Sequence, residues 1–353
     1  MEDKDKLKND IENVLNWGTT AGKNIDLLPE LVTYTQTQKD AYTMVRQDTV
    51  TNKLARLSSK SGLIPVEFTN TARITTSNGS TDLTVIIKEY ANVTLKNSTN
   101  KLLLALQGKL TETGDKFVKI PLKEYMELTG LKYEKEARKS IKADLDALNS
   151  ITCEARIKGN KNKNTGDYIK FEIIAERGIK NGVIFANFYD SIYAHLMNCP
   201  VMPVSKDLYK IPNKYPYAFY LGHKLTEQMK YNQHKPYFTI SVRKLLQICF
   251  ENGMPSYEKV QATDRAVERR IIGPFESNLD ACKDIFAWEY CNTKGQPLTE
   301  EQLQDRTYKD FEARYIKITF KSNYPVAEYD SKKHSKAEKQ EQKKAKKQKP
   351  VKK

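Results

Sequence analysis

The chain has 353 residues, of which 39% are apolar and 10% aromatic, so it can bury a large core, and its length allows two or three domains. Lysine and arginine number 59 against 44 acidic residues, which gives a net charge of +15. The last 23 residues, 331–353, hold eleven lysines and two glutamates, so this tail carries +9 and the rest of the chain about +6. No run approaches the roughly 18 apolar residues that span a bilayer, and the N-terminus lacks a signal-peptide pattern. We therefore expect a soluble, cytoplasmic protein.

Signatures of catalysis and of metal binding are missing from the sequence. The five cysteines are scattered and form no C-x-x-C pair, which predicts neither disulfides nor a zinc site. The four histidines lie too far apart for an H-E-x-x-H motif or for the metal-bound His-x-His pair of a rolling-circle nickase. The segment Gly18–Asn24 has three residues between its glycines, where a phosphate-binding loop needs four. We expect a protein that is not an enzyme and has no metal or cofactor.

An internal repeat is the main signal. Lys109–Glu112 recurs as Lys224–Glu227, and each copy ends a stretch with the apolar period of a helix. Residues 117–126 then match 237–246, a short strand that leads into a helix, and residues 144–148 match 278–282. The last pair predicts two helices with the same buried stripe, formed by Ala137, Ile141, Leu145 and Leu148 in one copy and by Ile271, Phe275, Leu279 and Cys282 in the other.

Strand-like sequence follows each of these helices. Residues 151–157 and 168–174 predict a hairpin in the first copy, and residues 285–290 and 314–320 predict one in the second. The order helix, strand, helix, helix, hairpin is that of a winged helix. We therefore predict an α+β fold with two tandem winged-helix domains.

The domain boundaries follow from the repeat. The first winged-helix domain covers 96–187 and the second 205–325, with a linker helix and a break at 188–204. Residues 1–95 form an N-terminal extension of unknown role. Residues 331–353 form a disordered lysine-rich tail that adds salt-sensitive affinity for nucleic acid or serves only for solubility.

In a helix-turn-helix the last helix buries one face and offers the other to the major groove. In the first copy the exposed cations are Lys132, Lys135, Arg138, Lys139 and Lys142. The loop of the predicted hairpin adds Lys161 and Lys163, at the tip of the wing. These residue types suit phosphate contact and guanine reading. The alternative is a solvated charged helix with a lysine-rich turn.

In the second copy the candidates for DNA contact are Lys259, Arg265, Arg269, Arg270 and Asn278, with Gly273-Pro274 at the predicted start of the helix. Arginine pairs bidentately with guanine and asparagine with adenine, so this copy is a candidate base reader. The alternative is that Arg269 and Arg270 form surface ion pairs with Glu268 and Glu276.

The two predicted winged helices, with the runs Arg269–Phe275 and Leu279–Tyr290, resemble the plasmid and mobile-element replication initiators of bacteria. The resemblance covers about two thirds of the chain. It implies a DNA-binding initiator of DNA replication that recognises repeated origin sites, can form homodimers and recruits host replication proteins. It also implies base reading by Arg269, Arg270 and Asn278, with phosphate contact and dimerisation assigned to the first domain.

Two other functions stay open at this point. A winged-helix transcriptional regulator would bind a promoter instead of an array of repeats, and no residue separates it from an initiator. A nickase or recombinase is disfavoured by the missing histidine pair.

Overall fold

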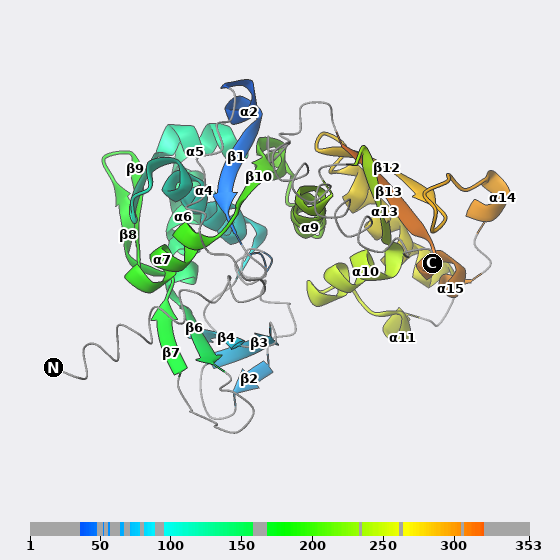
Figure 1. Ribbon diagram of the computed structural model, residues 1–353, viewed down its shortest axis with the longest axis horizontal. Helices are drawn as coiled ribbons and strands as arrows, with labels where there is room; N and C mark the ends of the chain where they lie inside the picture. Colours follow the sequence, from blue (N-terminus) through cyan, green and yellow to red (C-terminus); the bar gives the residue numbers. More distant parts are fainter. Residues whose placement is uncertain are drawn as a thin grey trace, which may run out of the picture.

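The computed structural model describes residues 36–47, 52, 56, 64–66, 71–77, 81–88, 95–157, 168–232, 235–260, 264–304 and 307–320. Figure 1 shows two groups of helices and small sheets, one around α4 to α6 and one around α10 to β13, with α9 drawn between them. Within these ranges no helix is long and apolar enough to cross a membrane. The predicted tail at 331–353 lies outside the described residues.

The first group contains a unit of helices and strands that we call the first unit. Its elements are α4 (Asn97–Thr113), β5 (Phe117–Pro121), α5 (Leu122–Thr129), α6 (Glu134–Asn149), β8 (Ile174–Lys180) and β9 (Val183–Phe188). The three strands form an antiparallel sheet in the order β5-β9-β8.

The second unit repeats this arrangement. It begins with α9 (Ala218–Tyr231), β11 (Tyr237–Ser241) and α10 (Val242–Glu251). The next elements are α11 (Tyr257–Val260), α12 (Asp264–Val267), the π-helix η2 (Glu268–Ile272) and α13 (Gly273–Asp280). It ends with β12 (Phe286–Cys291), α14 (Glu300–Leu303), α15 (Tyr308–Glu312) and β13 (Tyr315–Phe320). The sheet order β11-β13-β12 corresponds strand for strand to β5-β9-β8, so the two units share one topology.

The buried faces agree with the apolar periods in the sequence. All eight residues of the two predicted stripes are at most 2% exposed, from Ala137 to Leu148 in α6 and from Ile271 in η2 to Cys282 just after α13. Leu102, Leu106 and Leu110 of α4 and Leu221, Leu225 and Met229 of α9 are buried in the same way. These predictions are confirmed. Four cysteines, Cys199, Cys249, Cys282 and Cys291, are buried and free, as expected of small apolar residues.

The wing of the first unit is not the hairpin that the sequence pattern predicted. Residues 151–157 and 168–172 do pair, as β6 (Ile151–Ile157) and β7 (Tyr168–Glu172), but β6 also pairs with β4 and neither strand joins β5. The strand next to β5 is β9, which also pairs with β8 through the two-residue turn Asn181-Gly182, both of whose φ angles are positive. That turn type matches the twist of a hairpin, so β8 and β9 form the hairpin of this unit, which we call its wing, and β6 and β7 are an insertion before it.

Part of the N-terminal region belongs to the first half of the molecule. Strand β1 (Tyr42–Arg46), which follows α2 (Gln36–Ala41), pairs with β10 (Val201–Ser205). Strands β2 (Ile64–Val66), β3 (Thr71–Ser77) and β4 (Thr81–Lys88) extend the sheet of β6 and β7 in the order β2-β3-β4-β6-β7. The linker contains the predicted helix, α7 (Asp190–Asn198), and most of β10, and α8 (Lys206–Lys210) follows it. Strands of the predicted N-terminal extension therefore pair with strands of the linker and of the first predicted domain.

A buried polar cluster ties the N-terminal region to both units. His223 of α9 contacts Arg56 through Nδ1 and Gln47 through Nε2, each at 3.2 Å, and the Gln47 amide donates to Gln107 of α4 at 3.0 Å. Arg56 also pairs with Glu227 at 2.8 Å. Burial, followed by the neighbouring charge of Arg56, holds the pKa of His223 well below its usual value, so the ring is neutral.

Candidate nucleic-acid interface

Helix α6 is held against α4 by a buried carboxylate. Asp144 is 4% exposed and accepts hydrogen bonds from Thr99 at 2.7 Å, Ser98 at 3.0 Å and Ser140 at 3.3 Å. Burial raises the pKa of Asp144, and the three hydroxyl donors partly offset that rise. Ser98 and Thr99 lie in the first turn of α4, so Asp144 fixes the direction of α6 relative to that helix.

The opposite face of α6 is cationic. Lys132, Lys135, Lys139 and Lys142 are exposed, and among the described residues none of them has an ion-pair partner. At 100° per residue, Lys135, Lys139 and Lys142 fall within about 60° of one another. Arg138 borders this group and pairs with Glu134 at 2.7 Å. The structure therefore places the five predicted cations of the first unit on and beside one face.

An ion pair links the wing of the first unit to the same helix. Arg177 of β8 pairs with Asp146 of α6 at 3.0 Å, which connects the wing to the exposed side of α6. Lys180, the last residue of β8, is exposed beside the Asn181-Gly182 turn. Sequence reasoning missed both cations, although the Asn-Gly dipeptide between two alternating stretches was a sufficient hairpin signal. The predicted wing-tip residues Lys161 and Lys163 lie outside the described residues.

In the second unit, backbone of helical type runs without interruption from Asp264 to Asp280 through the π turn. Pro274 has no N–H and its ring would clash with the carbonyl of Arg270 in a regular α-helix. The helix widens just before it, and the Gly273 N–H donates to the carbonyl of Glu268, five residues back. Pro274 lies in the first turn of α13, as predicted, but the helical run itself begins ten residues earlier.

Three arginines are exposed on this helical run. Arg265, Arg269 and Arg270 are all exposed, as is Lys259 of the preceding short helix α11. The surface ion pairs that the sequence left open are not found among the described residues. Glu276 instead accepts a hydrogen bond from the Tyr290 hydroxyl at 2.8 Å, and burial raises the pKa of its carboxyl. Arg269 and Arg270 therefore keep their donor groups available at the surface.

Asn278 does not belong to this surface, so its prediction as a base-reading residue is corrected. The side chain is 2% exposed. Its Oδ1 accepts from the backbone N–H groups of Tyr217 and Ala218, both at 2.8 Å, and its Nδ2 donates to the Pro274 carbonyl at 2.6 Å. Tyr217 and Ala218 begin α9, whose first N–H groups have no partner within the helix. Asn278 therefore caps α9 instead of facing a ligand.

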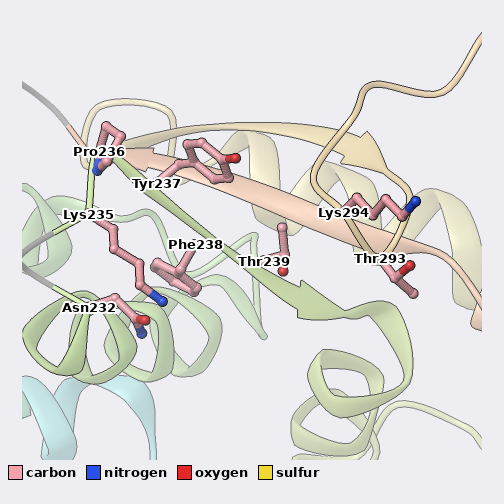
Figure 2. A pocket seen from close by; sticks show the side chains of 8 residues that line it. All are labelled: Asn232, Lys235, Pro236, Tyr237, Phe238, Thr239, Thr293 and Lys294. Carbon is pink, nitrogen blue, oxygen red and sulfur yellow. The ribbon is translucent and has the colours of Figure 1, made fainter. Parts of the chain in front are cut away.

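A shallow pocket of about 500 Å³ lies on the second unit away from these arginines. Figure 2 shows the side chains that line it along β11, with Lys235 at one end and Lys294 at the other. Tyr237 lies between them, and the ammonium group of Lys317 stands 4.9 Å from the centre of its ring. The described residues contain no group of three or more potential metal ligands, here or elsewhere.

Comparison with known proteins gives structural neighbours only. No protein-family model matches the chain, and no curated protein matches it. Solved structures that resemble it include a selenomethionine derivative of domains 2 and 3 of RctB, with 10% sequence identity and a TM-score of 0.43, covering 73% of this chain and 94% of that one. Another crystal structure of RctB domains 2 and 3 has 11% identity and a TM-score of 0.40, covering 74% and 96%. At these values no function is transferred from RctB to this chain.

Proposed function

We propose that the chain is a sequence-specific, double-stranded DNA-binding protein built from two tandem winged-helix domains. The observation that carries this proposal is the repeated position of the cations. Each unit exposes them on the helix that follows its strand-helix pair, α6 in the first unit and the run 264–280 in the second. That helix enters the major groove in a helix-turn-helix.

The two surfaces suit different parts of the duplex. Lysine is a flexible point charge and suits phosphate, whereas arginine presents a planar fork that pairs bidentately with guanine. The lysines of α6 therefore make backbone contacts, and Arg269 and Arg270 read bases. Arg265 and Lys259 flank these two arginines and contact the adjacent phosphates.

The biological role that we propose is initiation of DNA replication at repeated origin sites, with homodimers and host replication proteins as partners and no enzymatic step. The resemblance of the sequence to plasmid and mobile-element initiators supports this role. Two DNA-reading units in one chain also suit sites that span two successive major-groove segments.

The test is a footprint of the purified chain on the DNA that flanks its own gene. We expect protection of several evenly spaced direct repeats beside an AT-rich stretch. A single protected operator would indicate a transcriptional regulator instead, and coating without a fixed register would contradict sequence-specific binding.

A double substitution tests the assignment of the base-reading helix. Arg269→Ala with Arg270→Ala removes two bidentate donors, each of which contributes roughly 1–3 kcal/mol of discrimination. We expect the footprint to disappear while weak, sequence-independent binding remains. Lys39→Ala with Lys309→Ala removes the same charge from exposed positions on α2 and α15 and serves as the control. A footprint that survives the double arginine change contradicts the assignment.

A further inference from the structure

Two large apolar side chains are exposed at the start of α6. Tyr133 is 68% exposed and Leu131 is 40% exposed, and Lys132 lies between them. Both belong to the turn between α5 and α6, next to the cationic face of α6. The exposed charges beside them are Lys132 and Lys135, together with Glu136 and with Glu134, whose carboxylate is paired with Arg138.

The backbone of this turn is well defined. Gly130 ends α5 with a φ of 73°, and the N–H groups of Gly130 and Leu131 both donate to the Met126 carbonyl. The Tyr133 carbonyl accepts the first hydrogen bond of α6, from Ala137 at 2.9 Å. The side chains of Leu131 and Tyr133 are therefore presented from a fixed position.

Local structure does not account for the tyrosine. Tyr133 occupies the N-cap of α6, where Ser, Thr, Asp and Asn are favoured because their side chains accept from the first N–H groups. The Tyr133 side chain makes no such hydrogen bond, and it is not packed in the core. Neither capping nor burial explains an aromatic residue at this position.

The combination of charge and apolar surface fits a duplex. Lys132 and Lys135 are exposed on either side of Tyr133 and are available for phosphates. The apolar group that the major groove offers between the phosphates is the C5-methyl of thymine, which apolar side chains recognise. We propose that Leu131 and Tyr133 form a contact site for thymine methyl groups, so that the first unit reads sequence as well as phosphates. This inference depends on the proposed DNA binding and adds base reading to a unit assigned only backbone contacts.

The experiment uses the full chain and a duplex selected by the wild-type protein from a random pool. Each thymidine of that duplex is replaced in turn by deoxyuridine, which removes only the methyl group. For the wild type we expect a loss of affinity of about fourfold at one or two positions, the factor that corresponds to one buried methyl group. With Tyr133→Ser and with Leu131→Ser, the same positions should no longer distinguish thymine from uracil.

Matched controls are available in the same chain. Tyr231 on α9 is 62% exposed and Leu303 on α14 is 38% exposed, so Tyr231→Ser and Leu303→Ser repeat the chemical change outside the α5–α6 turn. Both controls should keep the wild-type response to deoxyuridine.

The outcomes separate this inference from the proposed function. The thymine site is refuted if deoxyuridine lowers the affinity of the wild type at no position. It is also refuted if deoxyuridine lowers the affinity of the Tyr133 and Leu131 variants as much as that of the wild type. In both cases DNA binding itself stands. If the wild type selects no duplex, both proposals fail together.

Discussion

The two units bury equivalent residues and expose different ones. A shift of 134 residues places Asp144 of α6 on Asn278 of α13, and both side chains reach the first turn of the leading helix of their own unit. Asp144 binds hydroxyl groups there, and Asn278 binds two backbone N–H groups. A carboxylate in one unit and an amide in the other thus make equivalent contacts, which shows that the repeat extends to polar contacts inside the core.

The exposed faces have diverged instead. The first unit has lysines on a regular helix and a short wing with a two-residue turn. The second has arginines on a helix with a π turn and carries α14 and α15 between its two wing strands. Shared buried stripes beside different exposed faces indicate that the core sets the fold, whereas the surface sets what each unit contacts.

The largest effect that would sharpen this comparison concerns the lysine face. Replacing Lys135, Lys139 and Lys142 together by alanine removes three proposed phosphate contacts and leaves the residues of the buried stripe unchanged. We expect affinity to fall on the order of ten- to a hundredfold for all duplexes, and the salt slope to decrease by up to about 2.7, since each contact contributes about 0.9. Binding isotherms at several salt concentrations measure both quantities. A loss restricted to particular sequences would give the first unit the role proposed for the second.

The next effect tests the structural role of Asn278. Asn278→Ala leaves the first N–H groups of α9 without their acceptor in a buried place, so the free energy of unfolding should fall by about 1–3 kcal/mol. Chemical denaturation measures this change. The folded fraction of the variant should keep the wild-type preference among duplexes. An altered base preference with an unchanged free energy of unfolding would contradict the capping role and support contact between Asn278 and DNA.

A third prediction concerns a variant that carries, at position 144 of the first unit, the residue type of the equivalent position in the second unit. Because burial raises the pKa of Asp144, the folded protein binds this proton more tightly than the unfolded chain does. This carboxyl therefore contributes a stability that falls as the pH rises above its ordinary value of 3.8. Asp144→Asn, which installs the amide of the second unit, should remove this contribution, so the stability of the variant relative to the wild type should increase as the pH rises above 3.8. Denaturation curves at several pH values measure this difference. Free energies of unfolding that change with pH by the same amount in both proteins would contradict the prediction.

The sequence predicted what depends on local periodicity. The leading helices, the strand-helix pairs and both buried stripes follow from apolar residues spaced three or four apart, and they lie where we expected them. The same spacing could have corrected one error. Ile271, Phe275, Asn278 and Cys282 are separated by four, three and four residues, so Asn278 belongs to the buried stripe and not to the exposed face.

Strand pairing was harder to predict from the sequence because paired strands lie far apart along the chain. Both candidate hairpins of the first unit alternate in the required way, and only the partner strand β5 distinguishes the wing from the insertion. The pairing of β4 with β6 joins residues about 70 positions apart, and that of β1 with β10 about 160. No periodicity in either strand specifies such a partner.

The smallest effect concerns the wing of the first unit. Lys180 is exposed at the end of β8, and β8 is connected to α6 through Arg177 and Asp146, so a duplex on the lysine face of α6 would bring its backbone near the wing tip. Lys180→Ala should lower the salt slope by about 0.9 and weaken binding a few-fold for every sequence. Lys309→Ala, an equal change on α15, should leave both unchanged. If Lys180→Ala has no effect while the triple lysine variant does, the duplex contacts α6 without reaching the wing. The two units would then differ in how they dock on DNA as well as in what they read.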